Sequence, residues 1–235
     1  MKPLRVVENA EELSRIATEE VLRAAGEAIA ARGSFFVALA GGSTPRMLYQ
    51  RLAAAPGVRF RRWQIFFGDE RCVPPDHLDS NYRMVKEALL DPAGIPPELV
   101  HRIPGEMEPA AAAVQYELEL AESFPGAAPR FDLVLLGMGA DGHTASLFPG
   151  TAALEERERL VRENRVEKLQ AWRVTMTLPL LNAARRVIFL VAGSDKAAAL
   201  RSVLQPAGGM ELPPAARVAP VDGSLLWLVD RAAAG

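Results

Sequence analysis

Residues 131–143 read FDLVLLGMGADGH, and this stretch decides the class of fold. Residues 131–136 are apolar apart from Asp132. A run without polar alternation is typical of a strand buried on both faces of a parallel sheet. The glycine-rich turn that follows places polar side chains directly after the strand. The stretch therefore predicts an α/β protein with polar residues at the carboxyl end of a strand.

The chain on both sides of this stretch repeats the order strand, loop, helix. The same kind of apolar run predicts strands at residues 4–7, 35–40, 64–67, 131–136, 173–177, 187–192 and 225–229. Amphipathic or capped segments predict helices at residues 9–31, 81–90 and 109–124, and further helices after residues 45 and 193. This alternation predicts a single Rossmann-like domain over residues 1–235, with an open, mostly parallel sheet and helices on both faces.

Composition excludes several classes of function. The formal net charge of -2 is spread over 235 residues, so bulk charge gives no reason to expect binding to nucleic acid or membranes. No apolar run approaches the ~20 residues of a membrane span, and the N-terminus has no apolar signal region. The lone cysteine, Cys72, allows no internal disulfide and fits a reducing cytosol. We expect a cytoplasmic protein that is a monomer or a small homo-oligomer.

Polar and glycine-rich residues gather after four of the predicted strands, at 41–46, 68–71, 137–143 and 193–196. In open parallel sheets the ligand crevice lies outside the carboxyl ends of the strands. All four loops should therefore face the same edge of the sheet. The sequence predicts one site built from these four segments.

Residues 137–142 also spell G-x-G-x-x-G, the fingerprint of a dinucleotide site. The fingerprint normally follows the first strand of a domain and opens a long helix, whereas Pro149 and Gly150 leave room for little more than one turn here. Asp141 would also repel a phosphate. We interpret the segment as a tight turn that presents Asp141 and His143 at the crevice, and we expect no cofactor.

His143 is the expected catalytic residue, because it follows a strand end in a glycine turn with Asp141 and Thr144 beside it. An unperturbed imidazole titrates near ~6.5, so it can take a proton from water at neutral pH. Asp141 would set the tautomer of the ring. His77 and His101 lack a comparable setting and are expected to be structural.

An anion cradle is the expected role of residues 41–46, which read GGSTPR. The backbone N–H groups of Gly41, Gly42 and Ser43 and the N-terminus of the next helix would attract an anion, with Arg46 in the first turn adding charge. The alternative is an ordinary helix cap by Ser43 or Thr44. Both interpretations are compatible with the pattern.

Further charged residues follow the other strands. Asp69 would orient a substrate hydroxyl, and Arg71 would serve the phosphate or a developing oxyanion; the alternative is a solvated loop with a local ion pair. Lys196, near a helix start, would act as a point charge on phosphate, or it is an ordinary surface lysine. Arg173 gives a weaker signal for the same role.

No metal site is expected, since one cysteine and three dispersed histidines lack zinc spacing. The chain also has no G-x-S-x-G nucleophile elbow. If the protein is a hydrolase, water is therefore the expected nucleophile. Cys72 is interpreted as a small buried hydrophobic residue.

The four segments together resemble the 6-phosphogluconolactonase family over nearly the whole chain. The resemblance rests on LAGGSTPRMLYQRL, FFGDERCVPPDHLDSNYRMVKEALL, FDLVLLGMGADGHTASLFPG and RVTMTLPLLNAARRVIFLVAGSDKA, in the order and spacing of the family. It implies a cofactor-free Rossmann-like domain that hydrolyses a phosphorylated sugar lactone. It also implies that His143 is the acid/base and that Asp69 and Asp141 line the pocket. The phosphate-binding groups that it implies are Gly42, Ser43, Arg46, Arg71, Lys196 and, less directly, Arg173.

Two rival functions share these features. The related glucosamine-6-phosphate deaminases also have GGSTP, but their histidine is followed by Ala-Phe-Asn-Glu, where this chain has TASLF at 144–148. Their acidic segment reads Asp-Glu-Tyr, and Arg71 replaces that tyrosine here. A non-catalytic sugar-phosphate sensor could use the same fold, but it would have no need of His143 and Asp141.

Overall fold

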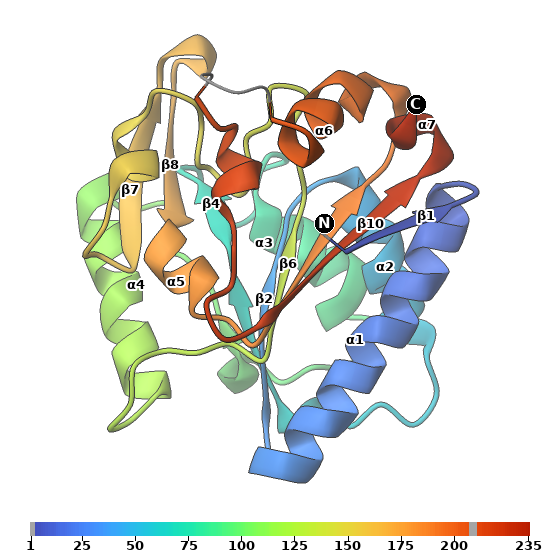
Figure 1. Ribbon diagram of the computed structural model, residues 1–235. Helices are drawn as coiled ribbons and strands as arrows, with labels where there is room; N and C mark the ends of the chain where they lie inside the picture. Colours follow the sequence, from blue (N-terminus) through green and yellow to red (C-terminus); the bar gives the residue numbers. More distant parts are fainter. Residues whose placement is uncertain (1–2, 207–210) are drawn as a thin grey trace.

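The structure, a computed structural model, describes residues 3–206 and 211–235. Their centre is a parallel sheet of seven strands in the order β1-β10-β9-β6-β2-β3-β5 (Figure 1). These strands are β1 (Leu4–Val7), β2 (Phe35–Leu39), β3 (Trp63–Phe67), β5 (Val100–His101), β6 (Leu133–Leu136), β9 (Arg186–Val191) and β10 (Ser224–Asp230). Because β1 pairs with β10, the first and last strands of the described chain lie side by side in this sheet.

The inner strands are apolar because both of their faces are covered. Every residue of β6 is buried, as are the last five residues of β9. Burial of apolar surface on both faces is the main force that places these strands at the centre of the fold. The unalternating runs at 131–136 and 187–192 are therefore confirmed as inner parallel strands.

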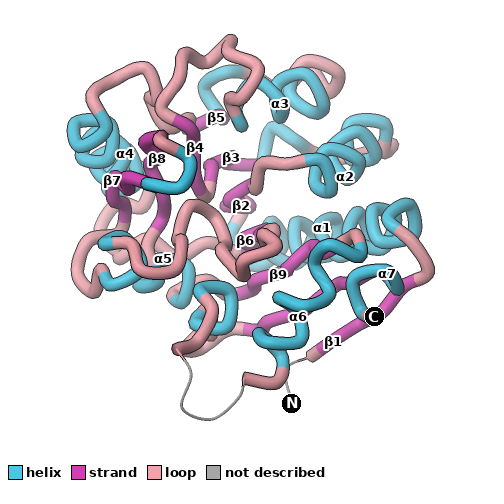
Figure 2. The backbone as a smooth tube through the Cα atoms, turned by 90° about the horizontal axis from the view of Figure 1, so that it is seen from above, coloured by secondary structure: helices cyan, strands magenta, loops and turns pink. Residues whose placement is uncertain are grey.

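Helices cover both faces of the sheet, as predicted. The helices are α1 (Ala10–Arg32), α2 (Ser43–Ala54), α3 (Asn81–Val85), α4 (Pro109–Ser123), α5 (Leu178–Asn182), α6 (Ala197–Leu204) and α7 (Arg231–Ala234). Figure 2 shows α1 and α2 along one face and α4 and α5 on the other. The Asn9 side chain accepts a 3.0 Å hydrogen bond from the Glu12 N–H at the start of α1, and Gly33 ends it at φ 81°. None of the described helices is long and apolar enough to cross a membrane.

A second, three-stranded antiparallel sheet differs from the sequence-based expectation. It has the order β4-β8-β7, formed by β4 (Asp69–Arg71), β8 (Ala171–Met176) and β7 (Val161–Val166). Residues 69–71 are therefore a strand and not a loop, and the strand predicted at 173–177 belongs to this sheet and not to the parallel one. The reason is that Asp69 pairs with Thr175 and Arg71 pairs with Arg173. A pairing between strands so far apart in the sequence cannot be predicted from a local pattern.

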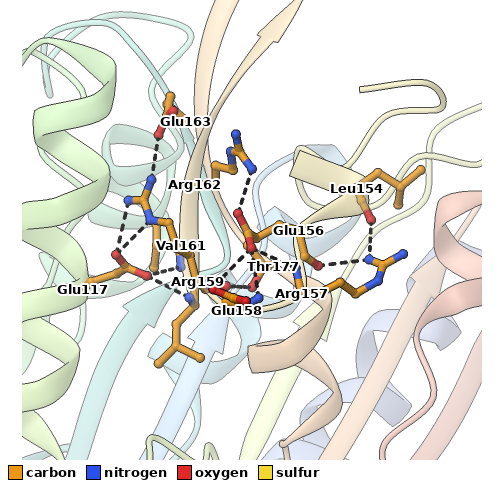
Figure 3. A network of polar contacts seen from close by, with 11 residues as sticks. Glu117, Leu154, Glu156, Arg157, Glu158, Arg159, Val161, Arg162, Glu163 and Thr177 are labelled. Atoms are coloured by element: carbon orange, nitrogen blue, oxygen red, sulfur yellow. Dashed lines mark hydrogen bonds and ion pairs between the residues drawn. The ribbon is translucent and has the colours of Figure 1, made fainter. Parts of the chain in front are cut away.

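Glu117 on α4 joins this small sheet to the rest of the molecule (Figure 3). One of its carboxylate oxygens accepts hydrogen bonds from the N–H groups of Leu160 and Val161, at 2.7 and 3.0 Å. The other accepts from the Arg159 guanidinium at 3.2 and 3.3 Å. The Thr177 hydroxyl donates to the Arg159 carbonyl at 2.6 Å. A carboxylate with four donors therefore sets the position of the small sheet against α4.

Candidate active site

A pocket of about 250 Å³ lies at the carboxyl ends of β9, β6, β2 and β3, four adjacent strands of the parallel sheet. The loop after each strand contributes to its wall, so the four polar segments of the sequence do meet at one edge. β2 and β6 run parallel, but the order in which strands are added reverses between them: β3 and β5 follow on one side, and β9 and β10 on the other. Ligand sites of open α/β sheets form at such a switch point. The lining includes Gly41, Gly42, Ser43, Thr44, Asp69, Arg71, Asn81, Gly139, His143, Ala145 and Lys196.

The N-terminus of α2 forms one wall of the pocket. No side chain caps this helix, and Gly42 precedes it at φ 102°, a conformation that favours glycine. The first N–H groups of a helix have no acceptor within it, so those of Ser43 and Thr44 are available at this wall. The alternative interpretation, a cap by the side chain of Ser43 or Thr44, is therefore not observed. Gly41 also lines the pocket, and the position requires glycine because a Cβ there would lie 1.8 Å from Oδ1 of Asn81.

The turn after β6 holds His143 and Asp141 as a pair, in which His143 lines the pocket, whereas Asp141, also expected in the lining, faces another cavity. Nδ1 of His143 lies 2.5 Å from Oδ1 of Asp141, which also accepts the His143 N–H at 3.1 Å. The imidazole stacks on the Phe148 ring with centroids 4.1 Å apart. A Cβ at Gly139 would lie 2.1 Å from the imidazole ring. The turn needs glycine at 139 because the pair occupies the space beside it.

Asp141 has a second partner that the sequence did not indicate. The Lys168 ammonium, on the short helix η5 (Glu167–Leu169) between β7 and β8, forms an ion pair with the other Asp141 oxygen. Partial burial raises the pKa of Asp141, but hydrogen bonds from Lys168 and His143 outweigh it and hold this pKa well below its usual range. Asp141 is therefore a carboxylate at neutral pH.

The acidic segment after β3 is buried, which contradicts the alternative of a solvated loop. Asp69 lines the pocket and accepts a 2.6 Å hydrogen bond from the Ser146 hydroxyl. The adjacent Glu70 is only 2% exposed. It accepts hydrogen bonds from the N–H groups of Asn81 and Tyr82, and burial raises its pKa against the effect of these bonds. Glu70 thus positions the start of α3 beside the pocket.

The four basic residues expected at the phosphate divide into two groups. Lys196 and Arg71 line the pocket. Arg46 and Arg173 lie outside the set of described residues that line it. Arg46 is 3.8 Å from Glu87, and Arg173 faces an adjoining cavity. Burial, followed by the charge of Arg71 across the strand pair, lowers the pKa of Arg173.

Sequence reasoning missed three residues that complete the site: Asn81, Ser146 and Lys168. Asn81 donates a 2.9 Å hydrogen bond to the Asp69 carbonyl, and Ser146 contacts the Asp69 carboxylate. Asn81 and Ser146 lie inside two of the segments that resemble the family, so those segments could have suggested them. Lys168 lies in none of these segments, and only the packing of the small sheet brings it to Asp141.

The remaining histidines and the cysteine have other surroundings. His101 contacts Glu119 at 2.5 Å and Gln64 at 2.7 Å, and Nδ1 of His77 accepts from the Asp79 N–H. Burial raises the pKa of the Cys72 thiol to about 11. Within residues 3–206 and 211–235, no group of three or more His, Cys, Asp or Glu side chains is arranged to hold a metal ion.

The comparisons with known proteins, by sequence and by structure, agree on one family. The sequence model of a family described as "Glucosamine-6-phosphate isomerases/6-phosphogluconolactonase" matches residues 8–227. A 6-phosphogluconolactonase of Nostoc is 45% identical over 210 residues, covering 88% of this chain and 86% of the relative. The 6-phosphogluconolactonase of Homo sapiens is 41% identical over 238 residues, covering 98% and 92%. The structure of 6-phosphogluconolactonase from Trypanosoma brucei has a TM-score of 0.87 at 31% identity, covering 100% of this chain and 98% of that one.

Proposed function

The chain belongs to the family of glucosamine-6-phosphate isomerases and 6-phosphogluconolactonases, and we propose that it hydrolyses 6-phospho-D-glucono-1,5-lactone to 6-phospho-D-gluconate in the pentose phosphate pathway. One observation carries the proposal. His143, which Asp141 holds from outside the pocket lining, is at the same pocket as the N-terminus of α2 and Lys196. A base and an anion site in one small pocket fit a substrate with a phosphate at one end and a reactive carbonyl at the other.

The phosphate of the substrate binds to the N-terminus of α2 and to Lys196. Uncapped N–H groups and the helix dipole favour an anion at this position, and the Lys196 ammonium, which also pairs with Asp195 at 2.8 Å, adds a positive charge. Arg71 lines the same pocket and supports either the phosphate or the oxyanion. Arg46 and Arg173 act only from outside the pocket wall. Docking the far end of the sugar in this way brings the lactone carbonyl to His143.

His143 acts as base and then as acid. In the neutral ring, Nδ1–H donates to Asp141, which leaves the lone pair of Nε2 free to accept a proton from water. The resulting hydroxide adds to the lactone carbonyl carbon and forms a tetrahedral oxyanion. The bond from this carbon to the ring oxygen then breaks, and Nε2–H returns its proton to the leaving oxygen. General-base catalysis of this kind contributes about 100 to 10,000-fold.

The test is lactone turnover by the whole chain and by His143→Ala. The lactone is generated in place from glucose 6-phosphate at slightly acidic pH, where spontaneous opening is slow, and acid release is followed. We expect acceleration proportional to enzyme, a loss of kcat of about 100-fold or more in His143→Ala, and little change in phosphate affinity. A His143→Ala protein with undiminished turnover would remove His143 from the mechanism.

Two other outcomes identify the rival functions. Without lactone acceleration, ammonia release from glucosamine 6-phosphate would identify a deaminase. Binding of 6-phosphogluconate without turnover of either substrate would identify a sensor. The relatives of this chain that carry the name 6-phosphogluconolactonase favour the first reaction. We place it in the cytoplasm, because a single cysteine fits a reducing compartment.

A further inference from the structure

Among the described contacts of Asp141, only Lys168 comes from the segment that joins β7 and β8 of the small antiparallel sheet. Its ammonium forms an ion pair with Oδ2 of Asp141, while Oδ1 holds the His143 ring. The same ammonium lies 4.8 Å from the centroid of the Phe148 ring, on which the imidazole stacks. Lys168 therefore contacts both residues that hold His143 in place, without lining the pocket.

Electrostatics gives this contact a consequence for His143. An isolated carboxylate beside an imidazole stabilises the protonated ring and would make it a poor base near neutral pH. A cation on the second oxygen offsets part of that negative charge and also repels the imidazolium directly. The carboxylate then still orients the ring, but it favours the charged form less.

From this geometry we propose that Lys168 is a positioning residue, which holds Asp141 against His143 and offsets the negative charge that this carboxylate presents to the imidazole. The proposal rests on the function proposed above for His143. The lowered pKa of Asp141 is consistent with it, because Lys168 contributes the largest of the effects that lower it.

Other charged groups also face the imidazole, and they must be held constant in a test. Lys196 reaches the pocket from η6 (Ser194–Lys196), and Asp69 and Arg71 reach it from β4. None of these three side chains is among the described hydrogen-bond partners of Asp141, which are His143 and Lys168. Removing the Lys168 charge therefore changes one partner of Asp141 and leaves the pocket wall intact.

The experiment compares Lys168→Met and Lys168→Arg with the unchanged protein. The first readout is the acid limb of the profile of kcat/KM against pH, and the second is the NMR titration midpoint of the His143 ring. The His143 signal is assigned by its loss in His143→Gln, and His77 and His101 serve as internal standards. For Lys168→Met we expect both the limb and the midpoint to rise by about half a pH unit at low salt, as for a partly exposed ion pair. Lys168→Arg should restore both.

Arg165→Met is the matched control, because Arg165 is on the same hairpin but pairs with Glu167 and Gln170. It removes one positive charge without touching Asp141, so the midpoint should stay in place. An unmoved midpoint in Lys168→Met, or an equal shift in Arg165→Met, would overturn the proposal. Absence of lactone turnover would instead refute the proposed function, and the NMR midpoint would still decide the effect of Lys168 on His143.

Discussion

The two sheets of this molecule are held together by different forces. In the parallel sheet, strands such as β6 and β9 are buried almost completely and contribute apolar surface on both faces. In the small antiparallel sheet, β7 has the sequence VRENRV with only three of its residues buried, and Glu117 ties its start to α4 through four hydrogen bonds. Apolar burial is non-directional, whereas charged hydrogen bonds depend on geometry. The large sheet therefore provides the buried core of the fold, and the small sheet orients the side chains that it adds to the pocket.

The pocket combines both kinds of region. Loops of the parallel sheet supply His143, the N-terminus of α2 and Lys196, which are the groups expected to meet the substrate, and also Asp141, which holds His143. The small sheet supplies Asp69 and Arg71 to the pocket wall. The turn between β7 and β8 supplies Lys168, which pairs with Oδ2 of Asp141. Substitutions in the loops should therefore change kinetics, and substitutions in the anchoring contacts should change stability or pH dependence.

The largest effect is expected for Gly139→Ala, which places a Cβ 2.1 Å from the His143 ring and 2.8 Å from the Asp141 carboxylate. The pair must move, and a displacement of about 1 Å can cost about 100-fold in turnover. Gly137→Ala is the matched control, because a Cβ there meets nothing within 4 Å. Lactone turnover and circular dichroism of both variants check this; equal losses in the two would show that the turn itself, and not the pair, had been damaged.

An intermediate effect is expected for Lys196→Ala, which removes a charge from the anion side of the pocket. KM for the lactone should rise about tenfold with kcat nearly unchanged, because a charged hydrogen bond contributes about 1.5–3 kcal/mol and the phosphate does not react. Steady-state kinetics with Lys86→Ala as a control measure the effect, since Lys86 pairs with Asp91 outside the pocket. An unchanged KM would remove Lys196 from the phosphate site.

The smallest kinetic effect is expected for Glu117→Gln, which weakens the anchor of the small sheet. The free energy of unfolding should fall by about 1–2 kcal/mol, because the amide keeps one acceptor oxygen but loses the charge. Urea denaturation measures the change, with exposed Glu122→Gln on the same helix as the control. We expect kcat to change less than about twofold. A large loss of kcat with unchanged stability would mean that the two sheets are coupled more tightly than their contacts indicate.

Much of the fold and of the pocket could be predicted from local patterns. The strand at 131–136 and the cap at Asn9 were visible because burial on both faces and helix capping each leave a signature within a few residues. His143 and Lys196 could be placed at one edge because parallel strands bring their carboxyl ends together. The same reasoning could not decide side-chain direction. It expected Arg46 at the phosphate, but this side chain lies 3.8 Å from Glu87 and outside the described lining of the pocket.

The amino-acid sequence by itself determined the parallel sheet, the glycine turns after its strands and the presence of His143 and Asp141 at their edge. Only the tertiary structure decided that β4 pairs with β8 about a hundred residues later, that Arg173 lines an adjoining cavity, and that Lys168 reaches Asp141. The physical reason is the range of each interaction. Apolar periodicity and glycine conformations act within a few residues. The partner of a charged side chain, in contrast, depends on which residues the folded chain brings close to it.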